Sequence, residues 1–166
     1  MTWGISTATF LQIHVVISLI GILAGLVVLY GLLTGRPSGA WTALFLATTI
    51  LTSVTGFPLP PFGTTPARVV GVISLVLLAV AVAALYGFRL AGPWRWIYLV
   101  SALAALYLNV FVGVTQSFQK LSFLKPLAPT QTEPAFLVAQ LVVLAAFIAF
   151  GALAVTRFHP EIKART

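Results

Sequence analysis

Long apolar runs dominate the chain, and short connections rich in glycine and proline separate them. Five runs are long enough to cross a membrane as helices, roughly residues 8–33, 40–57, 67–88, 94–118 and 135–158. A spanning helix needs about 20 mostly apolar residues. The pattern therefore predicts an all-α, polytopic membrane protein, a bundle of five transmembrane helices that forms a single transmembrane domain over residues 1–166.

The second run is the least apolar of the five, because Ser and Thr interrupt it several times. Four spans with one re-entrant segment are therefore an alternative. At the last run, we expect Thr132 to cap the helix, with Glu133 favoured by the positive end of the helix dipole. The connection 119–134 could lie over the end of the bundle as a lid.

Composition supports the membrane assignment and excludes several kinds of chemistry. Apolar residues make up 60% of the chain, whereas a soluble domain is about 45–50% apolar. Charged residues make up 7%, whereas a soluble domain has about 25%. Because the chain has no Cys, disulfides, thiolate nucleophiles and iron–sulfur ligation are excluded. With two acidic residues in all, paired-carboxylate catalysis is not expected.

The net charge of +7 bears on topology rather than on nucleic-acid binding, because the basic residues are spread singly over the connections. Five spans place the two termini on opposite sides. If the C-terminus is inside, the inner face carries Arg36, Arg89, Arg95, Arg157, Lys163 and Arg165. The outer face then carries only Arg68, Lys120 and Lys125. The positive-inside rule favours this arrangement, with the N-terminus outside.

Aromatic residues fit the same orientation, since Trp and Tyr concentrate at membrane–water interfaces. Six of them are expected near the inner interface: Tyr30, Trp41, Tyr86, Trp94, Trp96 and Tyr98. Only Trp3 is expected at the outer one. In a bacterium the outer face is the periplasm, so the N-terminus is predicted to be periplasmic and the C-terminus cytoplasmic.

Polar residues inside the spans gather in their outer halves, while the inner halves consist mainly of Ala, Leu, Val and Gly. Such residues usually face the interior of a bundle. We expect four of them to line one cavity open to the outer side, namely His14, Asn109, Gln116 and Gln140. Thr55 and Arg68 are expected at its mouth. The competing interpretation is helix packing through small residues and hydrogen bonds between helices.

Helical spacing places polar and small residues along one face of each of four spans. On the first span, His14, Ser18, Gly21 and Gly25 share a face, and on the second Thr48, Thr52 and Thr55 do so. The fourth carries Ser101, Ala105, Asn109, Gly113, Gln116 and Lys120 on one stripe. The fifth carries Glu133, Leu137, Gln140 and Leu144 on one stripe, with Glu133 expected near the surface.

His14 is the only histidine inside a span, and its charge can change near neutral pH. It could bind a ligand or accept a proton, or it could be a neutral packing residue. Haem and quinone are both candidate cofactors, and a haem- or quinone-linked membrane redox protein is an alternative function. A bis-histidine haem within one chain is not expected, because His159 follows the last span on the opposite side, about 20 Å away. Haem would need His14 alone, or two copies of it in a dimer.

Several segments resemble a group of uncharacterised bacterial multi-spanning inner-membrane proteins. They include Gln12-Ile-His-Val-Val-Ile-Ser18, Thr55-Gly-Phe-Pro58 and Leu108-Asn-Val-Phe-Val112. The most distinctive segment is the loop Ala128-Pro-Thr-Gln131 followed by Glu133-Pro134. The resemblance covers about residues 12–158 and implies an inner-membrane location, with no activity to carry over. Relatives tend to have His near the position of Arg68, so this chain departs there.

Four functions compete. The first is a non-catalytic membrane protein with a periplasm-facing pocket for a small amphipathic or lipid-like ligand, such as a quinone, haem or isoprenoid. The second is a structural or accessory subunit of a larger membrane complex, whereas a stable monomer or homo-oligomer with bound ligand would favour the first. Enzymatic activity ranks third. His14, Lys120 and Glu133 could form an acid–base pair, but their spacing does not require acid–base catalysis. Transport is fourth, because the inner halves offer no ionisable residue.

Overall fold

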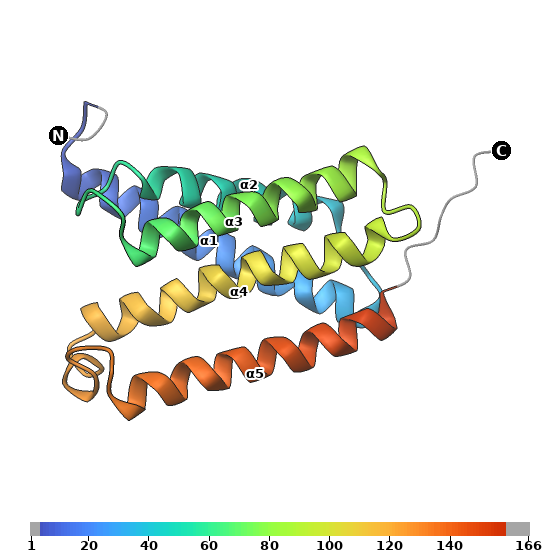
Figure 1. Ribbon diagram of the computed structural model, residues 1–166. Helices are drawn as coiled ribbons and strands as arrows, with labels where there is room; N and C mark the ends of the chain where they lie inside the picture. The colour runs from blue at the N-terminus through green and yellow to red at the C-terminus, as the bar shows by residue number, and fades with distance from the viewer. Residues whose placement is uncertain (1–3, 159–166) are drawn as a thin grey trace.

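The computed structural model describes residues 4–158 and consists of five long helices that run alternately up and down (Figure 1). They are α1 (Thr7–Thr34), α2 (Gly39–Gly56), α3 (Pro66–Val82), α4 (Trp94–Lys120) and α5 (Pro134–Arg157). A π-helical turn, Ala83–Gly87, extends α3, and a 3-10 turn, Lys125–Leu127, lies between α4 and α5. All five are long and apolar enough to cross a membrane. The predicted all-α bundle and the multi-pass class are confirmed.

With the π-helical turn counted as part of the third span, the observed ends lie within two residues of the predicted ones. The least apolar span, α2, is a continuous helix of 18 residues with a mean hydropathy of 1.2. At the start of α1, the Ser6 side chain accepts a hydrogen bond from the backbone N–H of Thr9 at 3.1 Å. At its end, Gly35 adopts φ +69°, a left-handed conformation that suits glycine. Local cap chemistry therefore fixes both ends.

The start of α5 differs from the prediction. Glu133, rather than Thr132, holds the N-cap position, and Pro134 is the first helical residue. The Glu133 carboxylate turns back to accept hydrogen bonds from the backbone N–H groups of Thr130 and Thr132, at 3.1 and 3.0 Å. Desolvation raises the pKa of Glu133, but these bonds and one from the Thr130 hydroxyl outweigh it and hold the pKa below its usual value.

Helices α1 to α4 form the packed body of the bundle. Its core is built from buried side chains such as Leu32, Phe45, Leu78, Leu99 and Leu106. Helix α1 approaches its neighbours closely at Gly25. A Cβ there would overlap Cδ1 of Leu106 on α4 and lie 2.9 Å from Cδ2 of Phe45 on α2. Small residues on α1 therefore let α2 and α4 come close, as the stripe with Gly21 and Gly25 predicts.

Helix α5 lies beside α4 at the edge of the bundle (Figure 1). Only Gln140 and Ala154 are buried within it. On the predicted stripe of α5, Leu137 is 57% and Leu144 37% exposed, whereas Gln140 is buried. The half-buried and buried residues of α5 follow a different seam: Phe136, Ala139, Gln140, Val143, Ala146, Phe147, Gly151 and Ala154.

We call the two ends of the bundle the His14 end, where α1 begins, and the Arg157 end, where α5 finishes (Figure 1). Five of the predicted interfacial aromatics lie toward the Arg157 end. The sixth, Tyr98, is instead 2% exposed in the core beside Thr42, because a hydroxyl with a partner can be buried. Predictions for Trp3, His159, Lys163 and Arg165 concern residues outside the described part of the chain.

Candidate functional site

His14 and Thr55 meet between α1 and α2, where the Nδ1 atom of His14 lies 2.8 Å from the Thr55 hydroxyl oxygen. That hydroxyl donates its proton to the carbonyl oxygen of Leu51, at 2.6 Å. Having no second proton, Thr55 accepts a hydrogen bond from Nδ1–H of His14. In the neutral ring Nε2 is then the unprotonated nitrogen, and no bond to it is recorded within residues 4–158. The half-buried imidazole thus offers one open acceptor.

A second polar cluster lies one to two turns deeper along α1. The Ser18 hydroxyl donates to Oδ1 of Asn109 on α4, at 3.2 Å. Three polar atoms surround the bare backbone of Gly21, since a Cβ there would lie 3.2 Å from each of Asn109 Nδ2, Thr48 Oγ1 and Thr49 Oγ1. The cluster therefore joins α1, α2 and α4 near the middle of the bundle.

Several atoms in this half of the bundle are buried without a hydrogen-bond partner in the described part of the chain. They are Oγ1 of Thr49, Oγ1 of Thr52, Nδ2 of Asn109 and Oε1 of Gln140. A buried polar group left unpaired costs about 1–3 kcal/mol. Native structures therefore usually give such groups a protein, water or ligand partner. These atoms mark the places where a bound polar group would be stabilised.

Gln140 serves a different contact from His14. Its Nε2 donates to the carbonyl oxygen of Phe111 and to the Thr115 hydroxyl, each at 3.2 Å. Gln131, in the loop before α5, donates from Nε2 to the carbonyl oxygen of Thr115, also at 3.2 Å. Both amides therefore fasten α5 and its loop to the outer part of α4. In these contacts Gln140 faces α4 rather than α1 or α2.

Gln116 lies on the Asn109 stripe of α4, which turns toward α1. This orientation follows from Gly113, where a Cβ would lie 3.3 Å from Cδ1 of Ile22 on α1. Gln116 is half-buried, and its amide makes no recorded hydrogen bond to residues 4–158. Lys120, at the end of the same stripe, is close enough to His14 to act on it electrostatically.

Arg68 organises the loop between α2 and α3. Its guanidinium donates to the carbonyl oxygens of Gly63, Phe57 and Leu59, at 3.0, 2.7 and 3.4 Å. It also lies over the Phe62 ring, 5.4 Å from the centroid. The side chain thus holds its own loop together at the His14 end.

The structure brings some predicted site residues together and separates others. His14 contacts Thr55, and Asn109 contacts the same helix, α1, through Ser18. Gln140 lies at the α4–α5 contact and Arg68 in the α2–α3 loop. Asn109, Thr48 and Thr49, which surround Gly21, are all buried. Two cavities, of about 790 and 320 Å³, are lined by other residues. The site described here is therefore a polar layer that is half-buried at His14 and Gln116 and buried at Asn109.

Sequence analysis did not select Ser18, Thr48 and Thr49 as site residues. Ser18 and Thr48 stood on the predicted stripes, whereas Thr49 did not. The signal that could have found them is Gly21, a glycine one turn after Ser18 on the His14 face. Where a glycine meets polar residues of a neighbouring helix, the missing side chain leaves those groups facing each other.

Within residues 4–158, no group of three or more His, Cys, Asp or Glu side chains could hold a metal ion. Comparisons of the chain with protein-family models, curated proteins and solved structures gave no match. The function is therefore inferred from the chemistry of the site and its place in the bundle.

Proposed function

We propose that the protein is a non-catalytic, multi-pass protein of the bacterial inner membrane that binds a small amphipathic, lipid-like ligand in the half of the bundle containing His14. The observation that carries this proposal is the open Nε2 acceptor of His14, held by Thr55, next to a layer of buried polar atoms without partners. Binding sites for small molecules are mostly apolar with a few convergent polar groups. Membrane-embedded polar residues are commonly functional.

The hydrogen-bond donors and acceptors of the polar layer indicate which chemical groups the ligand carries. A ligand hydroxyl would donate to Nε2 of His14, and a ligand carbonyl would accept from the free Nδ2 of Asn109. An apolar tail would lie against the Ala- and Leu-rich remainder of the bundle. Quinones and isoprenoid alcohols match this pattern. Haem is a further candidate, because an imidazole with Nδ1–H fixed by a neighbour presents Nε2 to iron.

The same proposal includes the orientation, with the N-terminus in the periplasm and the C-terminus in the cytoplasm. The Lys/Arg asymmetry supports it. So does the gathering of exposed Tyr30, Trp41 and Tyr86 toward the Arg157 end. Fusion of alkaline phosphatase to the C-terminus should give inactive enzyme in cells, since the phosphatase folds only outside the cytoplasm. An active fusion would reverse the orientation.

A second candidate function is that of a subunit in a larger membrane assembly, and α5 is the observation that favours it. Its exposed residues include Val138, Val142 and Ile148, each more than half accessible. Lipid alone can cover such a face, and so can a partner helix. Co-purification of defined partner subunits in stable stoichiometry, with no bound small molecule, would favour this role over ligand binding.

The test is purification in mild detergent followed by an absorption spectrum and an analysis of the extracted lipid. A Soret band would identify haem, and a quinone-type ultraviolet absorption would identify a quinone. We expect the His14→Ala variant to retain about tenfold less of the compound, the size of one lost hydrogen bond of about 1.4 kcal/mol. Ser101→Ala is the control, because Ser101 is a buried polar residue of α4 that lies toward the Arg157 end, away from His14. Equal retention by both variants would refute the proposal.

A further inference from the structure

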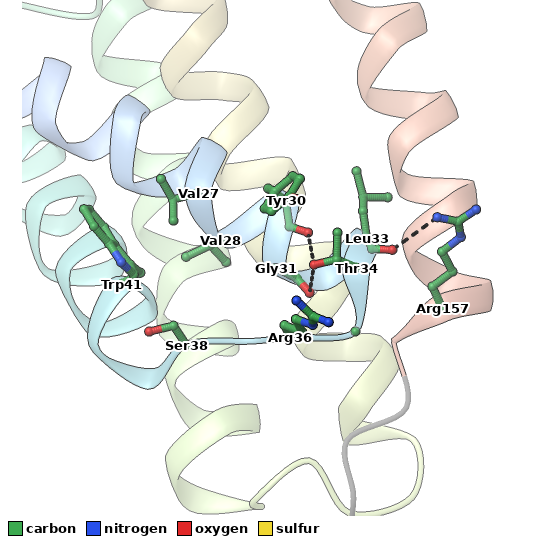
Figure 2. Close-up of a pocket in the computed structure, with 11 residues that line it drawn as sticks. Val27, Val28, Tyr30, Gly31, Leu33, Thr34, Arg36, Ser38, Trp41 and Arg157 are labelled. Atoms are coloured by element: carbon green, nitrogen blue, oxygen red, sulfur yellow. Dashed lines mark hydrogen bonds between the residues drawn. The ribbon is translucent and has the colours of Figure 1, made fainter.

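The larger cavity lies at the Arg157 end, away from the polar layer. It has a volume of about 790 Å³ and lies where α1 ends, the chain turns into α2, and α5 finishes (Figure 2). Arg36 in the turn and Arg157 at the end of α5 both line it. In Figure 2 their side chains flank the carboxyl end of α1. Two elements far apart in the sequence thus bring two cations to one cavity.

No carboxylate within residues 4–158 offsets the positive charge of this cavity. Arg157 donates one long hydrogen bond, 3.4 Å, to the carbonyl oxygen of Leu33. No side-chain bond of Arg36 is recorded with the described residues. The only carboxylate within residues 4–158 is Glu133, which lies at the opposite end of the bundle. Because a guanidinium carries several N–H donors in a planar fork, most donors of both arginines are available to an anion.

The amino end of α2 adds to this positive field. Ser38, which lines the cavity, is the N-cap residue, and its side chain makes no capping hydrogen bond. The first N–H groups of the 18-residue helix therefore lack a side-chain acceptor. A helix amino end carries a partial positive charge and favours anions. The arginines and the helix end attract the same kind of ligand.

The remaining lining identifies which anion fits. Tyr30 is 69% and Trp41 45% exposed, and such aromatic side chains prefer the membrane interface. Val27 and Val28, further toward the membrane interior on α1, form an apolar wall to the cavity. A ligand that fills it would meet cations at the interface and apolar side chains below. A phospholipid with a net negative headgroup has this arrangement, whereas free phosphate has only the charged part.

We propose that this cavity binds the phosphate headgroup of an anionic phospholipid through Arg36 and Arg157, with an acyl chain running along Val27 of α1. The site is separate from the polar layer around His14 and needs neither the ligand nor the orientation proposed above. Basic pockets between membrane helices bind anionic headgroups by this chemistry. Bound lipid would also tie the end of α1 to the end of α5.

The test measures lipid binding to the full-length protein in detergent by native mass spectrometry. Dioleoylphosphatidylglycerol, dioleoylphosphatidylcholine and inorganic phosphate are titrated separately and in competition. We expect preference for phosphatidylglycerol over phosphatidylcholine. Each arginine near an anionic headgroup contributes about fivefold in affinity. The double variant Arg36→Gln/Arg157→Gln should therefore bind phosphatidylglycerol about 25-fold more weakly. If it fails to fold, each single variant should show about a fivefold loss.

Arg89→Gln is the matched control, because Arg89 is an exposed arginine at the same end, in the turn between α3 and α4, and does not line the cavity. We expect it to bind phosphatidylglycerol as the wild type does. Equal losses in the control and the double variant would show a general charge effect and overturn the proposal. Inorganic phosphate that displaces the lipid at matching concentrations would also overturn it, because the site would then recognise a free anion.

Discussion

Replacing Gly25 with Ala tests how closely α1 approaches its neighbours. The added methyl would overlap Cδ1 of Leu106 and lie 2.9 Å from Cδ2 of Phe45. Both side chains are 1% exposed and cannot swing into open space. Either α1 must move away from α2 and α4, or the two side chains must leave their preferred rotamers.

The expected cost follows from two opposing terms. Inserting a methyl group into a well-packed core costs about 1–3 kcal/mol. Alanine recovers up to about 1 kcal/mol over glycine in a helix interior. The net loss should therefore be about 1–2 kcal/mol. Gly151→Ala is the matched control, because its Cβ would lie 3.7 Å from Cδ1 of Leu103, an ordinary contact.

The assay is equilibrium unfolding in mixed micelles of mild detergent and dodecyl sulfate, followed by circular dichroism. Gly25→Ala should unfold at a clearly lower dodecyl sulfate fraction than the wild type, while Gly151→Ala should unfold at the wild-type fraction or above it. If Gly25→Ala matched the control, the close contact of α1 with Leu106 and Phe45 would be wrong. The placement of His14 opposite Thr55 would then lose its support as well, since the same helix approach positions both.

Two further predictions concern the loops at the His14 end. Arg68→Gln should destabilise the protein by about 1–3 kcal/mol, because the charged hydrogen bonds to the loop carbonyls are lost. The same variant should be cleaved faster by protease within residues 57–65. The control variant Arg89→Gln should leave that segment protected. The pKa of Glu133 is lower in the folded protein than in the unfolded chain. The ionised carboxylate therefore stabilises the loop when the pH is above the unfolded-state pKa. This stabilisation is lost as the pH falls through the folded-state pKa. Hydrogen exchange at the N–H groups of Thr130 and Thr132 should therefore gain protection as pH rises through this range, beyond the intrinsic trend, and Glu133→Gln should abolish that gain. If the Glu133→Gln variant kept the pH-dependent gain in protection, a group other than Glu133 would be its cause.

The number and ends of the helices could be predicted from the sequence because lipid demands long apolar runs and proline or glycine ends them. The packing face of α5 could not. In lipid, an outward Leu is as favourable as an inward one, so apolar periodicity does not mark the core. The predicted stripe therefore includes Leu137 and Leu144, which are exposed, whereas Gly151 and Ala154, which permit close approach, lie on the observed seam.

Parts of the site could also be predicted, because polar groups in a membrane need partners. His14 and Thr55 were both selected from the sequence, and they are hydrogen-bonded. Thr49 was missed because side-chain spacing along α2 favours the Thr48 face, while Gly21 of α1 faces both residues. Contacts of this kind depend on how two helices are rotated against each other, which a single sequence does not fix.

The most direct test of the proposed ligand site is the nitrogen NMR spectrum of His14. In protein that is isotope-labelled at histidine and carries His159→Gln, His14 is the only histidine, so every imidazole signal comes from it. We expect a neutral ring with Nδ1 protonated, and an Nε2 resonance that shifts when co-purified compounds are removed by delipidation and returns when the extract is added back. An Nε2 resonance that is unchanged by delipidation would contradict ligand binding at His14 and leave the His14–Thr55 bond as helix packing.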